Sequence, residues 1–94
     1  MRDSEFEWDD RKAAANLARH RVSFEAARLA CDDPYALERE DPREHYGEAR
    51  YILLGMAQGR LLHVSYTTRR ERIRIISARV AEPFERRSYH EGNS

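Results

Sequence analysis

The sequence contains one cysteine, no long apolar run and no net charge, and the first two of these features each exclude a class of protein. The lone Cys31 cannot form an intramolecular disulfide and leaves no thiol cluster for zinc. No stretch approaches the ~20 apolar residues of a membrane-spanning helix. Residues 1–10 are acidic, whereas a signal peptide is basic and then apolar. We therefore expect a cytoplasmic protein that does not enter a membrane.

Familiar site motifs are also missing. The four glycines do not have the spacing of a phosphate-binding loop, and the chain has no His-Glu-x-x-His zinc motif. The four histidines are scattered and have no nearby cysteine or regularly spaced carboxylate that would complete a metal site. We expect neither a metal nor a cofactor.

The length of the chain limits it to one domain, since compact domains typically contain about 50–250 residues and this chain has 94. Hydrophobic residues make up 40% of the sequence and charged residues 36%, which is compatible with a folded domain. We place a single domain at residues 1–90 and a frayed polar tail at residues 91–94.

Charge is segregated along the chain although the total is zero. Residues 1–47 contain 12 acids and 8 bases, giving −4, whereas residues 48–94 contain 5 acids and 9 bases, giving +4. Such asymmetry hints at an anionic ligand for the second half. Sixteen of the 17 bases are arginine, which suits bidentate contacts to phosphate, although codon bias in a GC-rich genome explains the same preference.

The residue pattern predicts an α+β domain in two layers, in which an antiparallel meander packs against helices in the order β-α-α-β-β-β-α. Asp9 and Ser23 are candidate N-caps for the two helices that follow a short first strand. In the first helix, Ala13 and Leu17 form the inward stripe, with Ala14 and Ala18 beside them. Pro34 ends the second helix.

The second half of the chain has the pattern of strands. Residues 32–48 contain seven acids, two prolines and a glycine, which predicts a loop with short extended pieces. Three strands are expected at residues 50–57, 60–67 and 71–79, and a terminal helix begins at Pro83.

The third of these strands carries arginines on both faces. Strict alternation places Ile73, Ile75, Ser77 and Arg79 on one face, so Arg79 should emerge from the edge of the apolar layer. Both faces change character partway along the strand. One changes from apolar to polar and the other from charged to apolar.

Arginine is concentrated in the last third of the sequence. Between Arg60 and Arg79 there are six arginines and only one acid, Glu71, which gives a local charge of +5. Arginines on a sheet face are suited to phosphodiester contacts. A solvated surface explains the same run of charge, and both interpretations stay open at this point.

Two separated motifs in the right order resemble the BrnT-type toxins of type II toxin–antitoxin systems. The first runs from Phe6-Glu7-Trp8-Asp9-Asp10 through Asn16-Leu17-Ala18-Arg19-His20 to Asp33-Pro34, and the second covers residues 72–79 and then Glu85-Arg86-Arg87 and Tyr89. The resemblance implies a RelE-like fold and a metal-independent ribonuclease that arrests growth by inhibiting translation. Arg21 departs from the pattern, because the family usually has glycine there, and this should alter the turn between the helices. Glu82-Pro83-Phe84 also replaces a stretch that is commonly threonine and basic residues.

The resemblance directs attention to ten residues. Candidate catalytic residues are Arg79, Arg86, Glu85, Tyr89 and His20, and candidate substrate contacts are Glu71, Arg72, Arg74, Arg50 and Lys12. Three of these residues also have a purely structural interpretation. His20 could interact with the helix dipole, Glu85 could orient an arginine, and Tyr89 could pack on the sheet.

The expected reaction is attack of a ribose 2′-hydroxyl on the adjacent phosphate, with arginines stabilising the charge of the transition state. The resemblance implies a BrnA-type antitoxin as partner in a hetero-oligomer, RNA as substrate either free or on the ribosome, and contact with operator DNA only through the antitoxin. The alternative is a non-catalytic nucleic-acid-binding or protein-interaction module that uses the same arginine-rich face.

Overall fold

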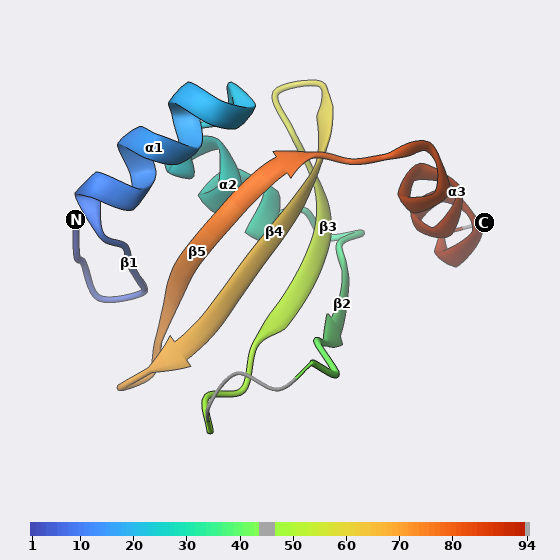
Figure 1. Cartoon of the computed structure of the whole chain (residues 1–94). Coiled ribbons are helices and arrows are strands. Elements are labelled where there is room, and N and C mark those ends of the chain that lie inside the picture. Colours follow the sequence, from blue (N-terminus) through green and yellow to red (C-terminus); the bar gives the residue numbers. More distant parts are fainter. Residues whose placement is uncertain (44–46, 94) are drawn as a thin grey trace.

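The structure, a computed structural model, describes residues 1–43 and 47–93. In these ranges three helices accompany one five-stranded mixed sheet with the strand order β1-β5-β4-β3-β2, in which β1 is parallel to β5 and the other neighbours are antiparallel (Figure 1). The expected α+β class is confirmed. The elements are β1 (Phe6–Glu7), α1 (Asp10–His20), α2 (Phe24–Cys31), β2 (Leu37–Glu40), β3 (Tyr51–Ala57), β4 (Arg60–Arg69), β5 (Arg72–Val80) and α3 (Pro83–Gly92).

Strand β2 corrects the expected order, which becomes β-α-α-β-β-β-β-α. It lies in the segment predicted to be a loop with short extended pieces, and it pairs with β3 from Leu37↔Leu54 to Glu40↔Tyr51. Three of its four residues are charged, so the strand has no alternating pattern of its own. Pairing with a buried neighbour determines its conformation, and sequence periodicity does not report such pairing.

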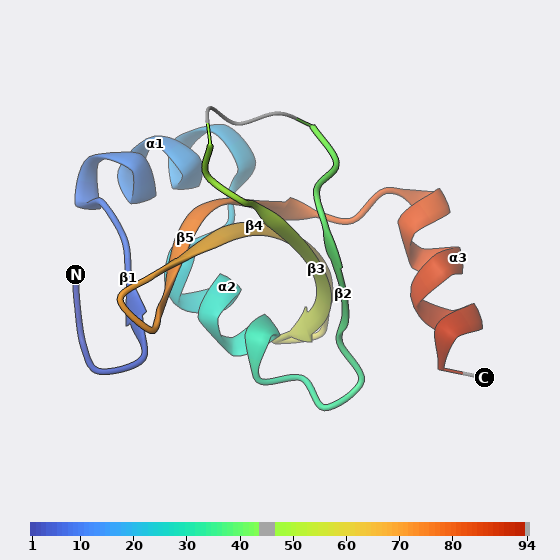
Figure 2. The same ribbon diagram turned by 90° about the horizontal axis from the view of Figure 1, so that it is seen from below.

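The main core lies between α2 and the concave side of the sheet. Figure 2 shows the sheet curving around α2, with α1 beside β5 and α3 beyond β2. Phe24 of α2 is fully buried and meets the edge of Trp8, with ring centroids 5.9 Å apart. The other buried members of this core are Phe6, Val22, Ala26, Ala27, Ala30, Leu53, Ala57, Leu62, Val64, Tyr66, Ile75 and Ala78.

A β-bulge in β5 changes which side chains share a face. Ser65 of β4 pairs with Ser77, whereas the next residue, Tyr66, pairs with Ile75, so Ile76 has no partner on β4. One extra residue reverses the alternation beyond it. Ile75 and Ala78 therefore both enter the core. Arg79 does not share a face with Ile73 and Ile75, and that prediction was wrong because it assumed an unbroken ladder.

Helix α1 packs against β5 through a polar residue. Asn16 is buried, whereas Leu17 is 49% exposed, so the inward stripe predicted from Ala13 and Leu17 is wrong at Leu17. The Asn16 side chain accepts from the Ala78 N–H (3.1 Å) and donates to the carbonyls of Ala78 (2.8 Å) and Val22 (2.9 Å). Among the described residues, no strand pairs with the outer side of β5 beyond Arg74, and Asn16 satisfies the N–H and carbonyl of Ala78 on that edge.

The turn after α1 keeps the geometry that glycine favours. Arg21 caps the helix with φ 58° and ψ 30°, which is the left-handed region, and its N–H donates to the Leu17 carbonyl at 2.9 Å. Arg21 therefore adopts a left-handed conformation that glycine adopts more readily.

Helix α3 packs on the other face of the sheet over a second, smaller core. Leu61, Ala81 and Tyr89 are its buried members, and Leu37 and Leu54 pack against them. The helix continues to Gly92, two residues into the segment predicted to be a frayed tail, because Gly92 lies against Leu37; a Cβ there would be 2.8 Å from Leu37 Cδ1. Ser94, the last residue of that predicted tail, lies outside the described residues.

None of the described helices is both long and apolar enough to cross a membrane. Over the described ranges, no group of three or more His, Cys, Asp or Glu side chains could hold a metal ion.

Candidate functional site

A cavity of about 590 Å³ opens on the sheet face that is turned away from α2. Its floor comes from the central strands, because alternation in β4 and the bulge in β5 bring polar residues to this face in paired positions: His63 opposite Arg79, and Ser65 opposite Ser77. The walls come from the end of α1, from β2 with the loop after it, and from the start of α3. The wall residues are Arg19, His20, Arg39, Asp41, Pro42, Arg43, Phe84 and Glu85.

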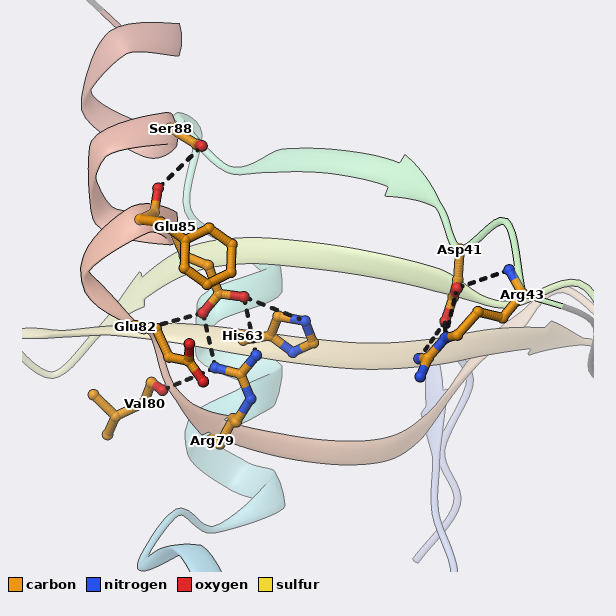
Figure 3. A network of polar contacts seen from close by, with 9 residues as sticks. Asp41, Arg43, His63, Arg79, Val80, Glu82, Glu85 and Ser88 are labelled. Atoms are coloured by element: carbon orange, nitrogen blue, oxygen red, sulfur yellow. Dashed lines mark hydrogen bonds and ion pairs between the residues drawn. The ribbon is translucent and has the colours of Figure 1, made fainter.

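Arg79 and Glu85 form a bidentate ion pair in this cavity. Arg79 Nη1 donates to Glu85 Oε1 at 2.8 Å and Nη2 donates to Oε2 at 3.0 Å (Figure 3). Glu85 Oε1 also accepts from the backbone N–H of Glu82 at 2.8 Å, which ties the carboxylate to the first turn of α3. The guanidinium is thus held in one plane while about a third of the side chain remains exposed.

The charges of this pair stabilise each other. Burial raises the pKa of Glu85, whereas the hydrogen bonds from Arg79 and the Glu82 backbone lower it. The lowering effects together are larger, so the pKa of Glu85 lies below its ordinary value. The hydrogen bond to Glu85 raises the pKa of Arg79. Glu85 is therefore an ionised partner of Arg79 at neutral pH.

His63 lies beside this pair on the cavity floor. Its Nε2 is 3.7 Å from Glu85 Oε2, and its side chain is 14% exposed (Figure 3). Burial and the positive charge of Arg79 lower the pKa of His63, and the opposing effect of Glu85 is smaller. The imidazole is therefore neutral at pH 7 and can accept a proton.

The cavity as a whole is basic. Among the residues that the structure describes, four arginines and two carboxylates line it, which gives +2 before the histidines are counted. Arg43 is neutralised by the buried Asp41, with Nη2 2.6 Å from Oδ2. Within residues 1–43 and 47–93, Arg19 and Arg39 have no ion-pair partner, so their charges are available to an anion.

The structure brings three of the five candidate catalytic residues to the cavity: Arg79, Glu85 and His20. Arg86 lies on the exposed side of α3 and does not line the cavity. Tyr89 is buried in the second core and its hydroxyl donates to Asp33 Oδ2 at 2.6 Å. Burial and this hydrogen bond raise the pKa of Tyr89 to about 12.

The candidate substrate contacts lie elsewhere. Arg72 donates to the Asp3 carbonyl at 2.6 Å, Arg74 pairs with Glu7 at 2.9 Å, and Arg50 lies 3.7 Å from Glu48. Together with Glu71, these arginines lie toward the far end of the sheet, and none of them lines the cavity. Lys12 lines a neighbouring groove beside α1.

Sequence reasoning missed His63 and Arg39. His63 could have been found, because Leu62, Val64 and Tyr66 form one apolar face of β4 and leave His63 and Ser65 as polar residues on the other. Arg39 could not have been found in this way, because it lies on β2, whose residues do not alternate between apolar and polar.

Comparison with known proteins relates the chain to one protein family. The family model described as the ribonuclease toxin, BrnT, of type II toxin–antitoxin systems matches residues 8–85. The matched segment contains every residue that lines the cavity. A search of curated proteins gives no match.

Proposed function

Because the chain belongs to the BrnT family of ribonuclease toxins of type II toxin–antitoxin systems, we propose that the cavity around Arg79 is the active site of a metal-independent endoribonuclease. The observation that carries this proposal is the Arg79–Glu85 pair beside a largely buried, neutral histidine on the floor of a basic cavity. We further propose a RelE-like fold and action in the cytoplasm, which the resemblance of the two sequence motifs implies.

Arg79 has the geometry required to stabilise a phosphorane. Attack of the ribose 2′-oxygen on phosphorus forms one P–O bond, and departure of the 5′-oxygen breaks another, leaving a 2′,3′-cyclic phosphate and a 5′-hydroxyl. Negative charge grows on the phosphate oxygens in the transition state. A guanidinium already fixed by Glu85 needs no reorganisation to meet that charge, and a single donor of this kind contributes about 10²–10³-fold to the rate.

His63 and His20 are the best placed proton carriers. His63 accepts the 2′-hydroxyl proton because its imidazole is neutral, and His20, at the end of α1, supplies a proton to the leaving 5′-oxygen. Each such transfer contributes about 10²–10⁴-fold. The Glu85 carboxylate is paired with Arg79, and the Tyr89 hydroxyl donates to Asp33. Neither Glu85 nor Tyr89 is therefore available to transfer a proton to or from the RNA.

The test is RNA cleavage in excess EDTA with Arg79→Ala and, as a matched control, Arg86→Ala. Arg79 lies on β5 and Arg86 on α3, and only Arg79 lines the cavity. We expect the Arg79 variant to lose at least about 10²-fold in rate and the Arg86 variant to cleave like the wild type, with both folded by circular dichroism. Wild-type cleavage by folded Arg79→Ala would contradict the role of Arg79.

Two further outcomes separate the remaining parts of the proposal. Cleavage that appears only when a divalent metal is restored would overturn metal independence. If RNA is bound but not cleaved by the wild type, the assay is repeated on translating ribosomes. Absence of cleavage there too would leave the alternative of a non-catalytic binding module.

A type II toxin has an antitoxin protein as its partner. We infer that it is of the BrnA type, that an acidic segment of it covers the basic cavity in a hetero-oligomer, and that operator DNA is reached only through it. Such a contact weakens as salt is added. Complex formation that is insensitive to salt would contradict electrostatic masking.

A further inference from the structure

A second hollow lies beside the cavity and shares lining residues with it. This hollow, the α1 groove, has a volume of about 230 Å³ and lies between α1 and the outer edge of β5. It shares Arg19, His20 and Ser77 with the larger cavity. Its other lining residues are Lys12, Ala15, Asn16 and Ile76. The α1 groove therefore adjoins the cavity at the three shared residues, and a chain bound in the cavity passes next to it.

Two cations lie along the α1 groove at helical spacing. Lys12 and Arg19 are seven residues apart on α1, which is about 10.5 Å at 1.5 Å per residue. Seven residues are close to two full turns, so both side chains lie on the same face of the helix. Both are exposed, and in the described part of the chain neither forms an ion pair. The N-cap Asp9 accepts from the N–H groups of Arg11 and Lys12, and the charge of Lys12 helps to lower the pKa of this carboxyl without forming an ion pair. Asp10, the first residue of the helix, pairs with the N-terminal amine at 3.0 Å.

The bulge supplies an apolar side chain to this groove. Ile76 is the residue left without a partner on β4, and it lines the α1 groove. Bulges next to active sites commonly redirect a side chain in this way. The groove thus combines two cations, which can bind the phosphates of a single strand, with an aliphatic side chain against which a base can bury its apolar face.

We propose that the α1 groove is a subsite for the nucleotide next to the cleaved bond, with flanking phosphates at Lys12 and Arg19 and a base packed on Ile76. The proposal rests on the proposed function, because it takes the substrate to be RNA with its reacting phosphate at Arg79. An acidic protein segment would also find the two cations. The groove shares Ser77 with the cavity floor and Arg19 and His20 with its wall, so the strand whose phosphate lies at Arg79 passes next to it, which favours the RNA itself.

The experiment measures the binding of a fully 2′-O-methylated single-stranded RNA, which lacks the attacking hydroxyl, as a function of salt. The variants are Lys12→Gln and Arg19→Gln, with Arg11→Gln as the matched control. Arg11 is an exposed cation of the same helix that does not line the groove. Each phosphate contact with a single strand contributes about 0.7 to the slope of log K against log salt. We expect each groove variant to lower the slope by about 0.7 and Arg11→Gln to leave it unchanged.

Ile76→Ala tests the base contact separately. We expect binding to weaken several-fold with an unchanged salt slope, because no charge is removed. Thermal melts confirm that the variant is folded. If Ile76→Ala does not fold, the salt slopes of Lys12→Gln and Arg19→Gln still test whether the α1 groove binds RNA.

The outcomes distinguish this inference from the proposed function. Slopes that stay at the wild-type value in both Lys12→Gln and Arg19→Gln, while Arg79→Ala abolishes cleavage, would overturn the subsite and leave the ribonuclease intact. Absence of RNA binding by the wild type, in solution and on ribosomes, would remove both. Poly-glutamate of matched length that binds as tightly as the RNA, with equal losses in the variants, would show a docking surface for an acidic protein instead.

Discussion

Replacement of Asn16 by alanine should destabilise the domain more than any replacement of its apolar neighbours on α1. The side chain is 7% exposed and makes three hydrogen bonds, one from the Ala78 N–H and two to the carbonyls of Ala78 and Val22. A buried hydrogen bond contributes about 0.5–1.5 kcal/mol net, and more is lost where its partner is left unsatisfied. We therefore expect a loss of about 2–4 kcal/mol in the free energy of unfolding.

The assay is urea denaturation together with thermal melting. At about 4–8 °C per kcal/mol for a domain of this size, Tm should fall by at least about 8 °C. Asn16→Leu has a similar volume but makes none of the three hydrogen bonds, so it should be destabilised as well. The control is Leu17→Ala, which should cost less than about 1 kcal/mol because Leu17 is half exposed. A larger loss for Leu17→Ala than for Asn16→Ala would refute the reasoning and restore the apolar stripe predicted from sequence.

Two further predictions concern packing and pH. Gly55→Ala should lower the free energy of unfolding by about 1–3 kcal/mol, because the new Cβ would lie 2.3 Å from the Ala30 carbonyl oxygen and α2 must move away from β3. The loss is measured as a lower urea midpoint, and an unchanged midpoint would contradict this close approach. Since burial and Arg79 lower the pKa of His63, the acid limb of kcat/KM should lie below pH 6.5, with activity lost as pH falls through that pKa because the protonated imidazole cannot accept a proton. His63→Gln should remove that limb, and a limb centred above pH 6.5 would exclude His63 as the base.

Those parts of the fold that local chemistry determines could be predicted from the sequence. Asp9 and Ser23 cap α1 and α2 as expected, since a short acceptor before an apolar run satisfies the first N–H groups of a helix. The three long strands were also found, because runs of β-favouring residues are separated by short turns, one of which contains glycine. Strand β2 was not, since its side chains are charged and its pairing with β3 is a tertiary contact. Helix α1 was given the wrong inward face because hydrophobicity ranks Leu17 above Asn16.

Prediction of the site succeeded where residues are close in sequence and failed where topology decides. Arg79 and Glu85 are six residues apart and meet across the turn into α3, so one motif contained both. Arg72 and Arg74 have the same local composition as Arg79, but they bond to the N-terminal segment instead. Charge density along the chain does not distinguish these arginines, because it contains no information on which partner lies opposite each of them.

The bulge at Ile76 connects the fold to the site. In an unbroken ladder Arg79 would face α2 with Ile73 and Ile75, and its charge would be buried in an apolar layer at a cost of several kcal/mol. The extra residue turns Ala78 into that layer and places Arg79 opposite His63 in the cavity. The sequence carries the signature of this shift, since both faces of the strand change character at the same point. In a regular strand, alternate side chains point to opposite faces, and each face keeps one polarity along the strand. One inserted residue exchanges the two faces beyond it, so the polarity of both faces changes at the same point. Arginine in the cavity and alanine in the core are therefore two consequences of the same local irregularity.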